Sequence, residues 1–256
     1  MAYGSKLIQD KLTFDINRGD VFVIMGGSGC GKSTLLKHMI GQFPPAKGDI
    51  LYDGQSFQNA NADQQLSMRR SWGISYQTGG LFSAMTLAEN TALPLQQYTA
   101  LSAAEIAEIV AYKLALVGLG GYQEYYPSEI SGGMAKRAAL ARAIALDPDI
   151  LFFDEPSAGL DPISSQLLDE LILEMQDSLG ATVVIVSHEL ASIFAIANNS
   201  VFLDAETKTM IDYGDPKILV EHSEQNKVRR FLSRGGSDQT SNNKSEENSP
   251  SQGGAV

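Results

Sequence analysis

Short, uninterrupted runs of apolar residues recur along the chain, and small or polar residues follow each of them. Three such runs span residues 21–25, 150–153 and 182–186. Continuous apolar runs of this length are typical of parallel strands that are buried on both faces. Segments with helical spacing of apolar positions separate the runs, so the pattern predicts an α/β fold with a parallel sheet at its centre.

Two of the predicted helices carry clear start and stop signals. Residues 102–105, Ser-Ala-Ala-Glu, have the pattern of a capping box, and the apolar stripe that follows ends at Gly118. Asp161 and Pro162 supply an N-cap and a first-turn proline, and Gly180 closes that helix. The apolar stripe consists of Ile106, Ile109, Val110, Leu114 and Val117.

The arrangement of these elements predicts how the chain is organised. Residues from about 85 to 145 are largely helical in pattern and form an insertion between strands. Residues 201–204 and 209–211 have the pattern of a closing hairpin. Residues 233–256 are polar and lack apolar periodicity, which predicts a disordered tail. No internal repeat is visible, so residues 1–232 are expected to form one domain.

A glycine-rich octet at residues 26–33 follows the first apolar run and fits the pattern G-x-x-x-x-G-K-[ST]. Its glycines allow successive backbone N–H groups to point at phosphate oxygens, and the start of the next helix adds positive charge. Lys32 is expected to reach the β- and γ-phosphates, and the Ser33 hydroxyl to ligate Mg²⁺. The octet therefore predicts a nucleoside triphosphate site, and the alternative is an accidental glycine-rich turn. The expected phosphate contacts are Gly26, Gly27, Ser28, Gly29, Cys30, Gly31, Lys32, Ser33 and Thr34.

Two carboxylates, Asp154 and Glu155, come directly after the apolar run of residues 150–153. A parallel strand that is covered on both faces delivers such acids to its C-terminal edge, where ligands bind. Asp154 is the expected partner of Mg²⁺, and Glu155 is the residue expected to polarise an attacking water. The alternative is a pair of solvated surface charges, which the preceding apolar residues disfavour.

A second predicted anion site lies between these two motifs. Ser131, Gly132 and Gly133 precede an alanine-rich helical stretch that ends before Asp147 and Pro148. A serine cap and free N–H groups at a helix start favour an anion. An ordinary helix start would show the same residues, but the phosphate loop upstream and the acid pair downstream favour a binding site.

Composition agrees with this interpretation and excludes some alternatives. The chain has 256 residues, of which 43% are hydrophobic, enough for a sizeable core. Its net charge of −11 argues against a nucleic-acid partner, which would need a positive patch. Cys30 is the single cysteine, and a free thiol suits a reducing cytoplasm. No apolar run approaches the roughly 18 residues that span a bilayer, and no signal-peptide region is visible at the start, so any membrane role is expected to be peripheral.

The order of these motifs resembles the nucleotide-binding subunit of an ABC transporter over about residues 3–233. The resemblance implies a P-loop NTPase cassette, with a parallel sheet core, a small antiparallel β subdomain and an inserted helical subdomain. Residues 26–41 and the helix of residues 134–140 resemble more closely the Mla/Mce-type lipid-transport ATPases, in which Met stands after the signature glycines, as Met134 does here, where most ABC subunits have glutamine. The motifs are, in order, the phosphate loop, Gln77, residues 130–134, Asp154 and Glu155, residues 157–161 and His188.

The resemblance implies three further residues at the nucleotide. Tyr3 matches the aromatic residue that stacks on adenine, and Gln77 matches the residue that contacts Mg²⁺ and the attacking water. His188 matches the switch histidine that bonds the γ-phosphate. His188 also follows the apolar run of residues 182–186, which places it at the same expected sheet edge as Glu155. A lone histidine after a strand is otherwise usually structural.

A homodimer that encloses two ATP molecules is a further implication of the resemblance. Ser131, Gly132 and Gly133 match the signature that binds the γ-phosphate of the opposite protomer's ATP. Asp161 matches a loop that crosses the dimer interface. Since the chain carries one phosphate loop and one signature, each site would be completed by the partner protomer.

Two departures from the family pattern stand out. Ile130 replaces the usual leucine, which is a conservative exchange. The chain begins Met1-Ala2-Tyr3, whereas ABC subunits normally have a full strand before the tyrosine. Either the start is assigned too late, or the small antiparallel sheet lacks its first strand.

Residues 78–87 follow Gln77 and carry no charge, although they are rich in glycine, leucine, phenylalanine and methionine. In the family, the groove that receives the permease lies just after the glutamine. This segment is therefore expected to contact a membrane partner. The alternative is that Leu81, Phe82 and Met85 fill the core of the helical insertion.

The function implied is that of a Mg²⁺-dependent ATPase that energises an ABC transporter for phospholipid or another lipid. The implied partners are an integral-membrane permease, an Mce-type lipid-binding protein and a small STAS-type accessory subunit, with no nucleic acid. The implied location is cytoplasmic, on the inner face of the inner membrane. The alternatives are transport of another substrate, a soluble ABC protein of translation or DNA repair, and a regulatory module that only holds ATP. The presence of Lys32, Glu155 and His188 disfavours the regulatory module.

Overall fold

The computed structural model describes residues 1–3 and 6–233, without the side chains of residues 2 and 3. Its main strands are β3 (Val21–Gly26), β6 (Trp72–Ser75), β7 (Ile150–Asp154), β8 (Thr182–Val186), β9 (Asn199–Asp204) and β10 (Thr209–Tyr213). They form one sheet in the order β10-β9-β3-β8-β7-β6. All neighbouring pairs are parallel except β9 and β10, which run antiparallel. The predicted parallel core and closing hairpin are thus confirmed.

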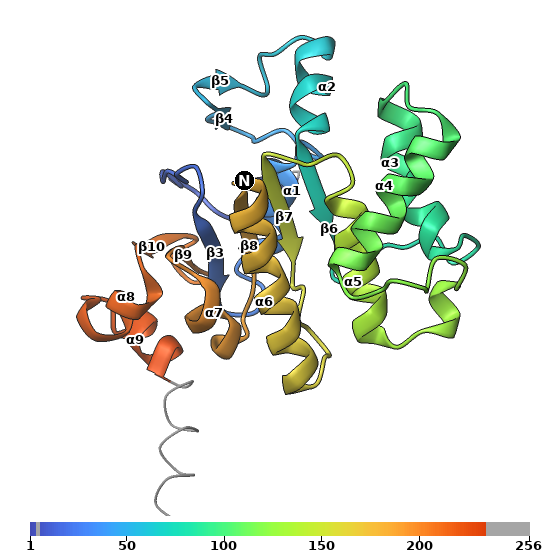
Figure 1. The fold of residues 1–256 in the computed structure, drawn as a ribbon. Coiled ribbons are helices and arrows are strands. Elements are labelled where there is room, and N and C mark those ends of the chain that lie inside the picture. The colour runs from blue at the N-terminus through green and yellow to red at the C-terminus, as the bar shows by residue number, and fades with distance from the viewer. Residues whose placement is uncertain (4–5, 234–256) are drawn as a thin grey trace, which may run out of the picture.

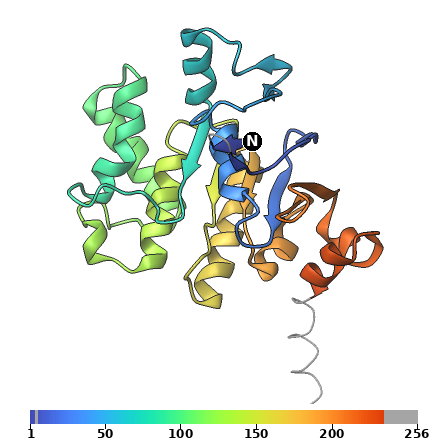
Figure 2. The ribbon, with the colours of Figure 1, turned by 180° about the vertical axis from the view of Figure 1, so that it is seen from behind.

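Both faces of the sheet are buried, as the apolar runs predict. Along β3, Phe22 and Ile24 belong to one apolar cluster, whereas Val23 and Met25 belong to the other, because successive side chains point to opposite faces. Helix α1 (Lys32–Met39) covers the first face. The second face is covered by α6 (Pro162–Leu179) and α7 (Leu190–Ile196), as Figures 1 and 2 show from opposite sides. The parallel strands β3, β7 and β8 all end at one edge, where the phosphate loop and the acid pair lie.

The helical insertion packs beyond β6, at one side of the sheet (Figure 1). It consists of α3 (Leu87–Tyr98), α4 (Ala103–Leu116), the 3-10 helix η1 (Pro127–Glu129) and α5 (Gly132–Ala143). The predicted capping box of α4 is present between Ser102 and Glu105. The predicted boundaries of α6 are also confirmed, with Asp161 as N-cap and Gly180 in the left-handed conformation at its C-cap.

The antiparallel part of the fold is small and divided. β1 (Ala2–Tyr3) pairs with β2 (Lys6–Leu7), and β4 (Leu51–Tyr52) pairs with β5 (Gln55–Ser56), as two separate ladders. Residues 8–20 belong to no strand. The antiparallel β subdomain implied by the resemblance is therefore reduced here to two short hairpins.

The remaining helices are α2 (Ala62–Arg70), α8 (Pro216–His222) and α9 (Asn226–Leu232). Helices α8 and α9 lie at the side of the sheet opposite α3, α4 and α5 (Figure 1). Within the described ranges, no helix combines the length and the apolar character that crossing a membrane requires. The predicted tail lies outside the described residues from residue 234 onward.

Candidate active site

The glycine-rich octet forms a tight loop between β3 and α1. A Cβ on Gly26 would lie 2.3 Å from the carbonyl oxygen of Leu203, so the loop approaches β9 too closely for a side chain. Gly29 and Gly31 have φ angles of +74° and +101°, a region that other residues rarely adopt. The shape of the loop therefore depends on these three glycines.

The end of this loop has the features of an anion site. Gly31 is the N-cap of α1 and offers no side-chain acceptor to the first N–H groups of the helix. The Lys32 ammonium donates to the carbonyl oxygens of Gly26 (2.9 Å) and Gly27 (3.3 Å), so it lies across the loop. Free amides at a helix start and a nearby ammonium attract phosphate groups. The loop therefore fits the triphosphate that its sequence predicts.

Cys30 is buried inside the loop, and this burial raises the pKa of its thiol. Its carbonyl oxygen accepts a hydrogen bond from the Gln9 side chain (2.7 Å), which also donates to the Asp204 carbonyl oxygen (2.9 Å). Gln9 is fully buried, and its two hydrogen bonds hold the loop against β9 in the interior of the protein. The Cys30 N–H donates to the Gly27 carbonyl oxygen (3.3 Å), so both backbone groups of Cys30 have partners within the protein and its expected phosphate contact stays a prediction.

Ser33 and Asp154 meet at the sheet edge, as the sequence predicts. The Ser33 hydroxyl donates to Asp154 Oδ1 at 2.8 Å, which joins the start of α1 to the end of β7. Among residues 1–3 and 6–233, no group of three or more His, Cys, Asp or Glu side chains could hold a metal ion without other ligands. Mg²⁺ is typically held by one or two protein oxygens together with substrate phosphates. The Ser33 hydroxyl and the Asp154 carboxylate fit that donor set.

Glu155 and His188 form a close pair beside them. His188 Nδ1 lies 2.7 Å and 2.8 Å from the two carboxylate oxygens of Glu155. Glu155 has a φ of +51°, an uncommon conformation for a residue with a side chain, and it is only 8% exposed. Its N–H donates to the Val186 carbonyl oxygen, which ties the turn to β8. We call Lys32, Ser33, Asp154, Glu155 and His188 the sheet-edge cluster.

Gln77 and Tyr3 are less closely tied to this cluster. Gln77 is exposed in the turn after β6, and its side chain makes no hydrogen bond with any described residue. Tyr3 lies in β1, but its side chain is outside the described part of the chain, so its expected contact with adenine stays a prediction. Thr34 is half-buried in the first turn of α1.

The remaining predicted residues form a second group at the starts of α5 and α6. The Ser131 hydroxyl accepts a hydrogen bond from the Met134 N–H (3.2 Å) and so caps α5. Asp161 caps α6, and hydrogen bonds from the hydroxyl and then the N–H of Ser164 lower the pKa of its carboxyl group. A Cβ on Gly133 would lie 3.6 Å from the Ser164 hydroxyl, so the two helix starts are adjacent. We call Ser131, Gly132, Gly133 and Asp161 the signature face.

The signature face stands apart from the phosphate loop. Within the described part of the chain, no hydrogen bond joins Ser131, Gly132 or Gly133 to residues 26–33. Ser131, Gly132 and Asp161 are exposed. The structure therefore brings the sheet-edge cluster together within one chain and leaves the signature face open to solvent.

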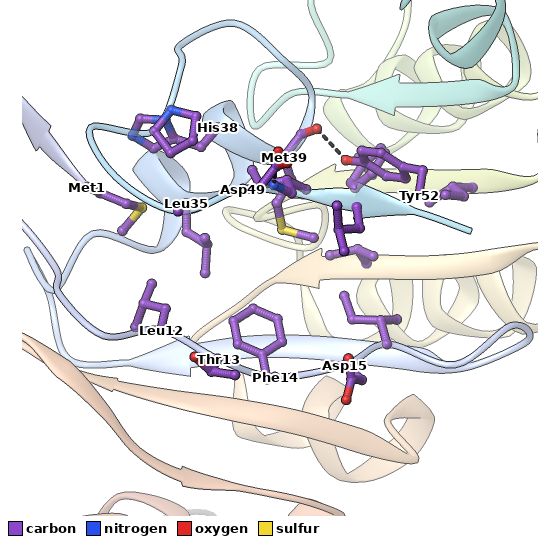
Figure 3. Close-up of a pocket in the computed structure, with 18 of the residues that line it drawn as sticks. Met1, Leu12, Thr13, Phe14, Asp15, Leu35, His38, Met39, Asp49 and Tyr52 are labelled. Carbon is purple, nitrogen blue, oxygen red and sulfur yellow. Dashed lines mark hydrogen bonds between the residues drawn. The ribbon is translucent and has the colours of Figure 1, made fainter. Parts of the chain in front are cut away.

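A large cavity lies away from both groups. It has a volume of about 1260 Å³ and is bounded by residues 10–16, residues 47–55 and α1. Figure 3 shows Leu12 and Phe14 on one side and Leu35 and Met39 on the other. None of the predicted site residues lines it, and its walls combine apolar side chains with charged ones. The chemistry of the sheet-edge cluster, and not cavity size, therefore indicates the candidate active site.

Several polar side chains that hold the loops of the site were not predicted from the sequence. Gln9 fixes Cys30 as described, Asn90 is fully buried in α3, and Lys136 and Arg142 of α5 donate to loop carbonyl groups. For the three residues that lie in helices, the one available signal was a polar residue within an otherwise apolar helical stripe. That signal does not reveal which loop each side chain contacts.

Comparison with known proteins supports a single family. The family model described as "ABC transporter" matches residues 9–158. The chain is 41% identical over 231 residues to "Probable ribonucleotide transport ATP-binding protein mkl" of Mycobacterium leprae, covering 90% of this chain and 66% of that protein. It therefore spans slightly less than two thirds of the mycobacterial relative. It is also 40% identical over 229 residues to "Intermembrane phospholipid transport system ATP-binding protein MlaF" of Escherichia coli strain K12, covering 90% of this chain and 84% of MlaF.

Similar solved structures are also ABC cassettes. The "Dimeric Structure of MJ0796, a Bacterial ABC Transporter Cassette" matches with a TM-score of 0.74 and 26% identity, over 81% of this chain and 90% of that one. A further structure is titled as a post-hydrolysis state of the same cassette bound to ADP and Pi, and it matches with a TM-score of 0.72.

Proposed function

The chain belongs to the ABC transporter family of ATPases, and from this premise we propose that it couples ATP hydrolysis to the movement of phospholipid or another lipid through a membrane permease. The observation that carries the lipid assignment is the 40% identity to MlaF over 229 residues, together with Met134 at the start of the signature helix. A second candidate substrate class is ribonucleotides, which the name of the mycobacterial relative gives for that protein.

The phosphate loop would hold the ATP phosphates through its backbone amides and the Lys32 ammonium. Mg²⁺, when bound, would neutralise charge on the β- and γ-phosphates, and Ser33, Asp154 and Gln77 would hold it. Two of the three N–H donors of Lys32 contact the Gly26 and Gly27 carbonyl oxygens, so one donor is left for a phosphate while these contacts persist.

Glu155 would act as the general base. It accepts a proton from a water molecule as the water oxygen bonds to the γ-phosphorus and the bond from that phosphorus to the bridging oxygen breaks. His188, which lies 2.7 Å from the Glu155 carboxylate, would orient this group and donate a hydrogen bond to the γ-phosphate. The left-handed backbone of Glu155 supports this role, because strained conformations cluster at functional sites.

The functional unit would be a homodimer in which the signature face of each chain closes on the ATP of its partner. The exposed Ser131 and Gly132 support this arrangement, as does the dimeric form in which the similar cassette MJ0796 was solved. The proposed partners are an integral-membrane permease, an Mce-type lipid-binding protein and a STAS-type accessory subunit. The chain would then be a cytoplasmic protein that binds the inner face of the inner membrane through the permease.

Phe82 marks the proposed contact with the permease. It is 56% exposed, whereas its neighbour Leu81 packs against the core, so Phe82 does not fill the core of the insertion. Tyr125 is also exposed. It lies near this segment, because its carbonyl oxygen accepts a hydrogen bond from the N–H of Leu87. Exposed aromatic groups of this kind are typical of interfaces.

Phe82→Asp tests this proposal. We expect the variant to fold and to keep its basal ATPase rate within about twofold, since an exposed side chain contributes little to stability. It should lose the permease and lose stimulation by phospholipid, because a charge would be buried in the interface. Ile218→Asp is the matched control, since Ile218 is 57% exposed on α8 at the opposite side of the molecule.

The measurement is purification of the tagged variants from solubilised membranes of the native host, followed by ATPase assays with phospholipid and with ribonucleotides. Loss of the integral-membrane partner in Phe82→Asp alone supports the docking site. Retention of that partner with full lipid stimulation contradicts it. Stimulation by ribonucleotides and not by phospholipid would contradict the lipid assignment and favour the second candidate.

A further inference from the structure

The loop that carries Gln77 is held to α5 by a single arginine. Arg142 donates to the Gly80 carbonyl oxygen at 2.8 Å and to the Gly79 carbonyl oxygen at 3.0 Å. Two nitrogen atoms of one planar guanidinium therefore bind two successive backbone carbonyl groups. Such a forked contact fixes both the position and the orientation of the loop.

The two glycines make this contact possible. Gly79 and Gly80 have φ angles of +74° and +60°, so both adopt the left-handed conformation. A Cβ on Gly79 would lie 3.4 Å from the Ala139 Cβ, and a Cβ on Gly80 would lie 3.4 Å from Arg142 Nη2. The loop thus lies directly against α5, and a side chain at either position would be strained and tightly packed.

A buried asparagine extends the contact to the proposed permease site. Asn90 is fully buried, and it accepts the Phe82 N–H at 2.8 Å and donates to the Phe82 carbonyl oxygen at 3.1 Å. Arg142 also lies 3.5 Å from the same Asn90 oxygen. One polar network therefore joins α5, the loop after Gln77 and the backbone of Phe82.

Helix α5 also holds the loop that follows Glu155. Lys136 donates to the carbonyl oxygens of Pro156 (2.6 Å) and Ala158. Ser131 caps the same helix at its start. A displacement of α5 would therefore move the signature serine, the loop of Gln77 and the loop after Glu155 together.

We propose that Arg142 is a positioning residue for ATP hydrolysis, which sets the position of Gln77 according to the position of the signature helix. When the partner's ATP engages Ser131, α5 shifts as a unit, and the Arg142 fork carries the Gln77 loop with it. This inference rests on the proposed role of Gln77 at the metal and the attacking water.

Arg142→Lys tests the proposal, because a lysine keeps the charge but cannot bind two carbonyl groups as a fork. We expect kcat to fall about tenfold, because the loss of one charge-assisted hydrogen bond corresponds to about this factor. The KM for ATP should change less than about twofold. Arg137→Lys is the matched control. Arg137 lies on the same helix and donates to the Val117 and Gly118 carbonyl oxygens, in a loop without site residues.

Amide hydrogen exchange gives a readout that does not depend on turnover. In Arg142→Lys, exchange of residues 78–82 should rise about tenfold while α5 itself keeps its protection. In Arg137→Lys, exchange of residues 78–82 should stay at the wild-type rate. Should Arg142→Lys fail to fold, Arg142→Gln replaces it, because its amide can still donate to one carbonyl group.

A double-mutant cycle separates this inference from the function it rests on. If Arg142 acts through Gln77, Arg142→Lys should add little to the loss of kcat in Gln77→Ala. Additive losses, or unchanged exchange of residues 78–82, would overturn the positioning role. Full activity of Gln77→Ala would instead overturn the proposed role of Gln77, and the exchange data would still decide whether Arg142 fixes the loop.

Discussion

The sheet-edge cluster and the signature face are both built at the ends of secondary structure elements, yet they differ in how complete they are. In the sheet-edge cluster, each side chain already has a partner in the same chain, such as Ser33 with Asp154 and Glu155 with His188. In the signature face, Ser131 and Asp161 only cap their own helices, and their outer sides face solvent.

This difference indicates how the two regions acquire their function. A cluster whose groups already lie together is preorganised, so nucleotide binding needs only an exchange of side-chain partners. An open helix start that has no acceptor beyond its own cap gains most of its contacts from an incoming ligand or chain. The comparison therefore predicts that changes in the sheet-edge cluster act within one chain, whereas changes in the signature face act on the partner.

The largest effect is expected for Glu155→Gln. The substitution keeps the shape of the side chain but removes the base, so hydrolysis should fall by about 10²–10⁴-fold. ATP should still bind and should hold the protein as a dimer, because no phosphate contact is lost. Phosphate release and gel filtration with ATP measure the two properties. Turnover at the wild-type rate would show that Glu155 is not the base.

A smaller but more specific effect is expected for Ser131→Arg. In the homodimer, hydrolysis should fall by about 10²-fold or more, because a bulky cation replaces the serine at the partner's phosphate. ATP binding to the isolated subunit should stay within about twofold of wild type. Lys32→Ala is the contrasting variant, since loss of charge-assisted contacts should weaken ATP binding of the same subunit by about tenfold or more.

Mixed dimers then test whether the sites are built across the two chains. A dimer of Ser131→Arg with Glu155→Gln would contain one wild-type site and one doubly altered site, so it should recover about half of the activity. A dimer of wild type with the double variant would carry one change in each site and should stay inactive. The reverse result would mean that each chain completes its own site.

The residues of the sheet-edge cluster could be predicted because their signals are local. Continuous apolar runs predict β3, β7 and β8 as parallel strands, and parallel strands of one sheet bring the residues after them to one edge. The glycine pattern of residues 26–33 and the acids after residue 153 then follow from single short segments. The same holds for the caps at Ser131 and Asp161, which the structure confirms as helix starts.

The supporting contacts were not predictable in this way. Arg142 and Gly80 lie 62 positions apart, and Gln9 and Asp204 lie 195 positions apart. Such pairs depend on how whole elements pack, and no periodicity in the sequence records them. The division of the antiparallel part into two short ladders has the same origin, because short edge strands are defined by their neighbours and not by their own pattern.

The smallest effect is expected at Asp204, the last residue of β9. Burial tends to raise the pKa of this carboxyl group, but hydrogen bonds from Thr207 and Lys227 outweigh it and lower the pKa to about 2. Because the pKa in the folded state is below the ordinary value, the stabilisation is complete above about pH 4. It is lost as the pH falls toward about 2.

Asp204→Asn should therefore lower the free energy of unfolding at pH 7 by about 1–2 kcal/mol, and this difference from wild type should shrink between about pH 4 and pH 2. Urea unfolding at several pH values measures it. Glu206→Gln is the matched control, because Glu206 pairs with the same Lys227 but is largely exposed, so the loss of its charge should change the free energy of unfolding little.

Asp204 also bears the carbonyl group that Gln9 binds beside Cys30. A change in ATP affinity larger than about twofold in Asp204→Asn would mean that the preorganised loop depends on this remote charge, and that the sheet-edge cluster is less self-contained than its own contacts indicate.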